Sequence, residues 1–222
     1  MELTIIIPTN RPYSEYAERT VENINSFQLR HSYEIAIVSK DEVSGKNVRW
    51  VKEEERKGPI KAFNDVISAS DSQYFIVMVD DHIFYRNPSD AVDFVAQELA
   101  DKRFPIASLA SGAPCYNPLK GQLLGKSDVD FDVGRYPLCR FPVFDRRALK
   151  ELGGVIFHPK LYYHAGDILL GYYMGMNGEP SQDCPVAVRP HNPAKDSSFE
   201  VADCEIVKDI IKEYMGGKKE YI

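Results

Sequence analysis

The first 110 residues alternate short, continuously apolar runs with segments in which apolar residues recur at helical spacing. Each apolar run predicts a strand buried on both faces, because it leaves no polar side for solvent. These strands are expected at residues 3–8, 34–38, 48–51, 74–79 and 106–110. The segments with apolar residues three or four apart predict helices at residues 14–29, 59–69 and 89–99. Such alternation is typical of an α/β fold with a mostly parallel sheet and crossover helices.

The pattern changes after residue 110. Residues 111–142 are rich in proline and glycine and predict an irregular excursion that has room for an antiparallel hairpin. Further helices are expected at residues 146–152, 167–176 and 203–215, and a last strand at residues 186–189. No stretch has the composition of a linker, so residues 1–222 are expected to form a single domain, a three-layer α/β/α sandwich.

Composition and charge exclude several classes of protein and of binding partner. Hydrophobic residues make up 44% and charged residues 27% of the chain, which excludes a disordered, collagen-like or coiled-coil protein. The net charge of −6 disfavours duplex nucleic acid and anionic membranes as partners. The four cysteines lack metal-site spacing and predict reduced packing thiols of a cytoplasmic protein. No signal peptide is visible, and no apolar run approaches the ~18 residues of a membrane span.

Polar clusters follow three of the expected strands. They are Thr9-Asn10-Arg11, Ser39-Lys40-Asp41 and Asp80-Asp81-His82. In open parallel sheets, ligands bind beyond the carboxyl ends of the strands. We therefore expect one crevice lined by all three clusters.

The cluster Asp80-Asp81-His82 is the most unusual, because it ends the most apolar strand of the chain. Adjacent carboxylates repel each other and gain nothing for folding. They make sense if a cation binds there, since carboxylate oxygen and imidazole nitrogen both suit Mn²⁺-type or Mg²⁺-type ions. The alternative is a solvated turn in which an aspartate caps the following residues.

The order of motifs resembles the family 2-like glycosyltransferases with the GT-A fold. The first strand ends in Pro-Thr-Asn-Arg at residues 8–11, and Gly58, Ala62 and Asn64 match the motif that precedes the metal strand. Asp80-Asp81-His82 stands where the family has Asp-x-Asp. The second half adds an Arg-x-x-Leu segment at residues 146–149, Gly153-Gly154, and Gly166-Asp167 at a helix start.

The resemblance implies a metal-dependent, inverting transfer of sugar from a nucleotide-diphosphate sugar, such as a UDP-sugar, to a saccharide or other hydroxyl acceptor. Residues 1–110 would then bind the nucleotide, and residues 111–222 the acceptor. Asp167 would be the catalytic base, and a Mn²⁺ or Mg²⁺ ion would offset the repulsion between the donor diphosphate and the carboxylates. The implied nucleotide-binding residues are Pro8, Thr9, Arg11, Asp41, Asn64, Asp80 and Asp81, and the implied metal ligands are His82, Asp80 and His191.

The sequence also departs from the family. Asp41 stands displaced from the end of the second strand, Gly166 replaces a glutamate, and an arginine that usually follows on the helix after Asp167 is absent. Two alternatives stay open: a nucleotidyltransferase, for which only Arg11 offers a triphosphate contact near the first strand, and a nucleotide-sugar-binding module without catalysis.

Overall fold

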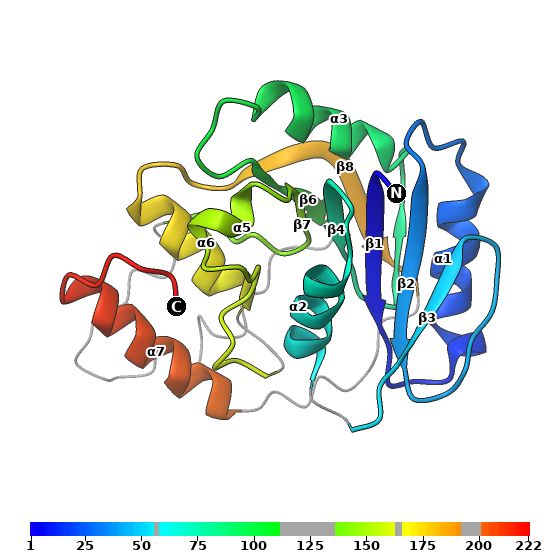
Figure 1. Cartoon of the computed structure of the whole chain (residues 1–222), viewed down its shortest axis with the longest axis horizontal. Coiled ribbons are helices and arrows are strands. Elements are labelled where there is room, and N and C mark those ends of the chain that lie inside the picture. Colours follow the sequence, from blue (N-terminus) through cyan, green and yellow to red (C-terminus); the bar gives the residue numbers. More distant parts are fainter. Residues whose placement is uncertain (56–57, 112–135, 163–165, 192–200) are drawn as a thin grey trace.

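A central sheet of eight strands organises the computed structural model, which describes residues 1–55, 58–111, 136–162, 166–191 and 201–222 (Figure 1). The strands are β1 (Leu3–Pro8), β2 (Tyr33–Ser39), β3 (Val48–Lys52), β4 (Tyr74–Val77), β5 (His82–Phe84), β6 (Ile106–Ser111), β7 (Pro142–Asp145) and β8 (Gln182–Pro190). The helices are α1 (Ala17–Ser26), α2 (Pro59–Ala69), α3 (Ser89–Glu98), α5 (Ala148–Glu151), α6 (Gly166–Met176) and α7 (Val201–Met215), with the 3₁₀ helix η1 (Tyr13–Glu15) before α1.

The sheet has the strand order β3-β2-β1-β4-β7-β6-β8-β5. Strands β3, β2, β1 and β4 are parallel to one another, with Pro8 opposite Val38 at the carboxyl ends of β1 and β2. β6 and β8 also pair in parallel. Among the described strands, β7 and β5 run against their neighbours, so the sheet is mostly parallel with two reversed strands.

Helices cover both faces of the sheet, as the apolar runs predict. One buried cluster joins α1 and α3 to the face of β1 that carries Ile5 and Ile7. A second cluster joins α2, α5, α6 and α7 to the opposite face, which carries Ile6. Side chains alternate between the two faces of a strand, so three successive isoleucines supply both layers. The single-domain α/β/α architecture expected from the sequence is confirmed (Figure 1).

The sequence pattern missed two strands. β5 follows the Asp80–Asp81 turn directly, and its three residues are too few to give a periodic signal. β7 has four residues and begins where the irregular segment ends. The helix expected at residues 14–29 is split into η1 and a shorter α1. The hairpin considered within residues 111–142 falls mainly on residues outside the described ranges.

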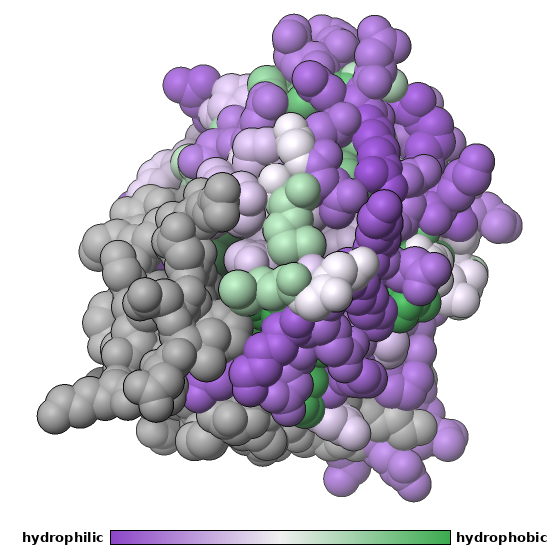
Figure 2. All heavy atoms as spheres, turned by 90° about the vertical axis from the view of Figure 1, so that its left-hand side faces the viewer, coloured by the Kyte–Doolittle hydropathy of each residue, from purple (hydrophilic) through white to green (hydrophobic). Residues whose placement is uncertain are grey.

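On the side of the molecule that carries α7, the described residues present a mainly hydrophilic surface with small hydrophobic patches between polar side chains (Figure 2). Ile210 and Tyr214 of α7 are turned into the core. None of the helices in the described part of the chain combines the length and the apolar character needed to span a bilayer. Cys139 and Cys184 are buried free thiols, and burial raises the pKa of Cys184 to about 11.

Candidate active site

Asp80 lies three residues beyond the carboxyl end of β4, which stops at Val77 rather than at the expected residue 79; it sits next to the carboxyl end of β1 and is only 3% exposed. Its two carboxylate oxygens accept a bidentate contact from Arg11: Nε donates to Oδ2 over 3.0 Å, and Nη2 contacts Oδ1. Thr9 donates its hydroxyl to Oδ2 over 2.5 Å. The Arg11 guanidinium also stacks over the Tyr16 ring, 4.0 Å from its centroid. Two of the polar clusters expected to meet therefore do meet, and Arg11 neutralises the buried carboxylate.

Asp81 and His82 continue this polar edge. Asp81 Oδ1 lies 2.6 Å from Nδ1 of His82, and Oδ2 lies 3.4 Å from Nη2 of Arg11. Burial opposes ionisation of Asp81, but the neighbouring His82 and Arg11 outweigh it and lower the pKa of that carboxyl. Asp81 is therefore ionised and fixes the His82 ring, with the proton on Nδ1 and the lone pair on Nε2 in the neutral form.

A buried threonine holds the turn that carries these groups. The Thr20 hydroxyl of α1 lies 2.9 Å from the carbonyl oxygens of both Asp80 and His82, and 3.2 Å from Nε2 of His191. The hydroxyl has one proton, and carbonyls can only accept it, so Nε2 of His191 must be the donor in the third contact. The backbone N–H of His191 also donates to the Asp81 carbonyl over 2.8 Å. His191 thus lies beside the predicted cluster and ties the end of β8 to it.

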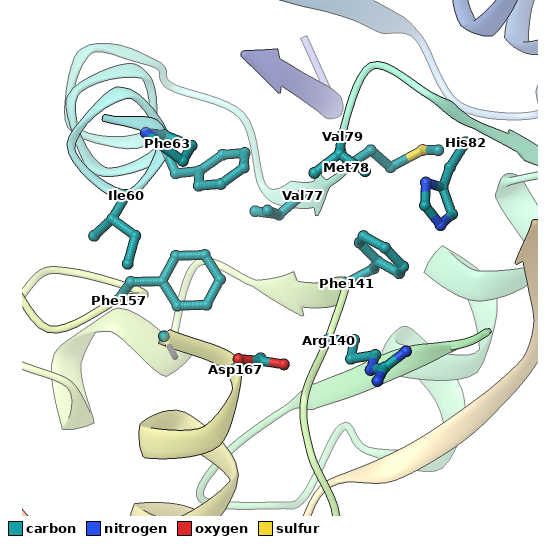
Figure 3. A pocket seen from close by; sticks show the side chains of 12 residues that line it. Ile60, Phe63, Val77, Met78, Val79, His82, Arg140, Phe141, Phe157 and Asp167 are labelled. Carbon is teal, nitrogen blue, oxygen red and sulfur yellow. The ribbon is translucent and has the colours of Figure 1, made fainter. Parts of the chain in front are cut away.

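A pocket of about 310 Å³ opens beside His82 and reaches the first turn of α6 (Figure 3). His82 stands at one end next to Phe141, with ring centroids 4.9 Å apart. Asp167 at the start of α6 and Arg140 in the segment before β7 also line the pocket (Figure 3). The remaining walls are mostly apolar: Pro59, Ile60, Phe63, Val77, Met78, Val79, Phe157 and Gly166. One pocket therefore contains both His82, a predicted metal ligand, and Asp167, the predicted base, although they lie far apart in the sequence.

The position of Asp167 depends on a glycine with no room for a side chain. A Cβ on Gly166 would lie 2.6 Å from Cδ1 of Phe157 and 3.3 Å from Cδ1 of Ile60. The family's glutamate cannot be accommodated here unless the Phe157 ring moves. Asp167 follows in the first turn of α6, where the helix dipole favours a negative charge.

The other predicted residues lie around this centre. Pro8 ends β1, and Thr9 donates its backbone N–H to Val38 at the end of β2. Asp41 is exposed in the turn after β2, where the Ser39 hydroxyl donates to its carbonyl over 2.7 Å. Asn64 lies on α2, and its amide bonds to the backbone of residues 156–157. Neither Asp41 nor Asn64 is among the pocket-lining residues.

Sequence reasoning missed Arg140, Phe141 and Thr20. The first two lie at the end of the irregular segment 111–142, which no periodicity resolves. Thr20 carried a usable signal, because it is a polar residue on the apolar stripe of α1 with Ala17, Val21 and Ile24. A hydroxyl at such a position needs a buried partner.

The side chains fit a divalent metal ion only in part. Within the described ranges, no group of three or more His, Cys, Asp or Glu side chains is arranged to hold one. The Asp80 carboxylate is engaged by Arg11 and Thr9, and Nε2 of His191 by Thr20. His82 does fit, because Asp81 orients its ring as metal-binding histidines require. Of the three predicted metal ligands, His82 alone therefore has surroundings compatible with that role among the residues that the structure describes.

Comparison with known proteins identifies the fold. No protein-family model and no curated protein matches the chain by sequence. Among solved structures, the mannosyltransferase PcManGT from Pyrobaculum calidifontis, in complex with GDP-Man and Mn²⁺, matches with a TM-score of 0.63 at 17% identity over 98% of this chain. S. aureus TarS 1-349 in complex with UDP-GlcNAc matches with a TM-score of 0.62 at 13% identity over 99% of this chain. The chain spans 65% and 68% of those two proteins.

These neighbours share a class of fold, the GT-A fold of nucleotide-sugar-dependent glycosyltransferases. The mostly parallel sheet of this chain, covered by helices on both faces, has that fold. The fold expected from the order of the sequence motifs is thus confirmed.

Proposed function

We propose that this protein is a glycosyltransferase that moves a sugar from a nucleotide-diphosphate sugar to a hydroxyl acceptor with inversion at the anomeric carbon. The observation that carries the proposal is the shared pocket of His82 and Asp167 at the carboxyl end of β4. It lies where ligands bind in sheets of this kind. Two neighbours in the comparison carry GDP-Man and UDP-GlcNAc, which supports a donor of the same chemical class.

In this proposal the nucleotide lies along the carboxyl ends of β1 and β2, near Thr9, Arg11 and Asp41. Arg11 compensates the buried Asp80 carboxylate, so the ionised Asp81 leaves that edge with one net negative charge facing the donor phosphates. The diphosphate lies toward His82, and the sugar enters the pocket beside Phe141.

Asp167 acts as the general base. It takes the proton of the acceptor hydroxyl as the acceptor oxygen forms a bond to the anomeric carbon. The bond from that carbon to the phosphate oxygen breaks, and the nucleoside diphosphate leaves with the electron pair. A well-placed base of this kind contributes about 10²–10⁴-fold to the rate. One carboxylate is enough for a single displacement, which inverts the anomeric centre.

A Mn²⁺ or Mg²⁺ ion, when bound, would neutralise charge on the departing diphosphate. His82 would hold it, with Asp81 orienting the imidazole. PcManGT was solved with Mn²⁺, which supports manganese as the first ion to test. The buried free thiols Cys139 and Cys184 support a reducing, cytoplasmic location.

The test combines calorimetry with a donor turnover assay on the full chain. GDP-mannose and UDP-GlcNAc are titrated with and without Mn²⁺ into the wild type, Asp167→Asn and Asp71→Asn, the last altering an exposed aspartate after α2. We expect donor binding in all three proteins and at least a 100-fold loss of turnover in Asp167→Asn alone. Equal turnover in all three would refute the role of Asp167. Tight binding without turnover over a broad acceptor pool would favour a binding module, and turnover of nucleoside triphosphates would favour a nucleotidyltransferase.

A further inference from the structure

The side-chain amide of Asn64 hydrogen-bonds to the backbone of a dipeptide far along the chain, Ile156-Phe157. Its Nδ2 donates to the Phe157 carbonyl over 2.8 Å, and its Oδ1 accepts the N–H groups of Ile156 and Phe157, each over 3.2 Å. An asparagine amide offers one oxygen with two lone pairs and two N–H donors. Both lone pairs and one donor are used here, which leaves little for a nucleotide.

The dipeptide held by Asn64 supports the start of α6. The Phe157 side chain is 4% exposed and packs on Phe63 of α2, with ring centroids 5.6 Å apart. Its ring edge lies so close to Gly166 that a Cβ there would come within 2.6 Å of it. Any shift of the backbone at Phe157 therefore moves the ring that lies against the residue preceding Asp167.

α2 holds the same segment at a second point. The Ile60 N–H donates to the Tyr162 carbonyl over 3.3 Å. Gly58 has a φ of 81°, and a Cβ there would lie 2.3 Å from that carbonyl oxygen. The Ile60 N–H and the Asn64 amide thus hold both ends of residues 156–162, shortly before Asp167 in the chain, and Gly58 at the start of α2 permits the close approach to Tyr162.

We propose that Asn64 is a positioning residue for Asp167, acting through Phe157 and Gly166. The expected loss of kcat rests on the proposed function, whereas the expected structural effect at residues 166–167 does not. The motif Gly58-x-x-x-Ala62-x-Asn64 thus aligns the base with the pocket. A misplacement of about 1 Å in a reacting group can cost about 100-fold in rate, so loss of the Asn64 amide should reduce kcat.

The experiment compares Asn64→Ala, Asn64→Asp and a matched control, Asp65→Asn, in the full chain. Asp65 is the next residue on α2, but it is exposed and pairs with Lys61. Asn64→Asp keeps an acceptor for the two N–H groups but places a carboxylate oxygen against the Phe157 carbonyl, so it tests the donated hydrogen bond separately. For each protein we measure the donor Kd by calorimetry and kcat at saturating donor. Amide hydrogen exchange at residues 156–157 and amide NMR shifts at residues 166–167 complete the comparison.

The expected result is a kcat lowered about 10- to 100-fold in both Asn64→Ala and Asn64→Asp, with a donor Kd within about twofold of the wild type. Exchange at residues 156–157 should become at least about tenfold faster and the 166–167 shifts should move, while amides of β1 keep their protection. A weaker donor Kd with unchanged kcat would overturn the inference, because Asn64 would then contact the nucleotide. Unchanged exchange and shifts would also overturn it. If the wild type turns over no donor, the proposed function fails, and the exchange and shift measurements alone decide whether Asn64 positions Asp167.

Discussion

His158 gives the protein a pH-dependent stability that can be worked out from its surroundings. The residue is 2% exposed, and its Nδ1 accepts the Lys160 N–H over 3.3 Å. The neutral ring therefore carries its proton on Nε2, a buried atom that has no hydrogen-bond partner among the described residues. The ring packs edge-on against Tyr221, 5.8 Å between centroids. Burial, together with the charges of Lys160 and Lys218, lowers the pKa of His158 to about 4.

The unfolded chain binds a proton at this histidine with the ordinary pKa of about 6.5, whereas the native protein does not bind it until about pH 4. The free energy of unfolding is therefore unaffected by His158 above about pH 7 and falls as the pH drops from about 6.5 to about 4. A difference of about 2.5 units corresponds to about 3 kcal/mol, which is a large part of the stability of a typical domain.

The variant His158→Asn removes the titration and keeps an acceptor near the position of Nδ1. Urea denaturation of both proteins at several values between pH 4 and pH 8 gives the free energy of unfolding at each pH. The informative quantity is how the difference in free energy of unfolding between the two proteins changes with pH, because this removes any constant offset between them. We expect the wild type to lose about 3 kcal/mol more than the variant between pH 7 and pH 4. Parallel pH profiles would refute the account of a buried neutral imidazole.

Three further substitutions test the site. Arg11→Met leaves the buried Asp80 carboxylate without its cation and should cost about 3 kcal/mol in urea denaturation at pH 7; a cost below about 0.5 kcal/mol would contradict the buried ion pair. Thr20→Val keeps the side-chain volume and removes the hydroxyl that holds the Asp80–His82 turn, so it should lower the free energy of unfolding by about 1–3 kcal/mol and weaken donor binding. Thr20→Ser keeps the hydroxyl and should match the wild type in both denaturation and calorimetry. Equal behaviour of the two variants would contradict the role of the hydroxyl. Gly58→Ala adds a Cβ against the Tyr162 carbonyl at a positive φ and should lower the free energy of unfolding by more than about 1 kcal/mol, whereas a stabilised variant would show that the close approach is wrong.

Much of the fold could be predicted because its central strands are continuous apolar runs. β1 with Ile5, Ile6 and Ile7 has no polar side, which only burial between two helical layers explains. β5 and β7 escaped prediction because three or four residues at the edge of a turn or loop carry no period. Their pairing is set by partners far along the chain, and such tertiary constraints are invisible to local patterns.

For the site, too, some residues could be predicted from the sequence and their contacts could not. The sequence could predict that Asp80, Asp81 and His82 belong to the site, because adjacent charged groups at the end of an apolar strand do not favour folding. Their pairing with Arg11 could not be predicted, since it depends on how the turn after β1 folds back on the end of β4. Local sequence likewise gave no sign that the Asn64 amide would bind the backbone 93 residues away.

The most direct test of the central claim is to follow donor and product anomeric signals by ¹H NMR while the full chain acts on a nucleotide sugar. The wild type should release nucleoside diphosphate and give a product of inverted anomeric configuration, Asp167→Asn should give at least 100-fold less, and Asp71→Asn should match the wild type. A retained configuration, or undiminished turnover in Asp167→Asn, would contradict the assignment of the pocket between His82 and Asp167 as the site of a single displacement.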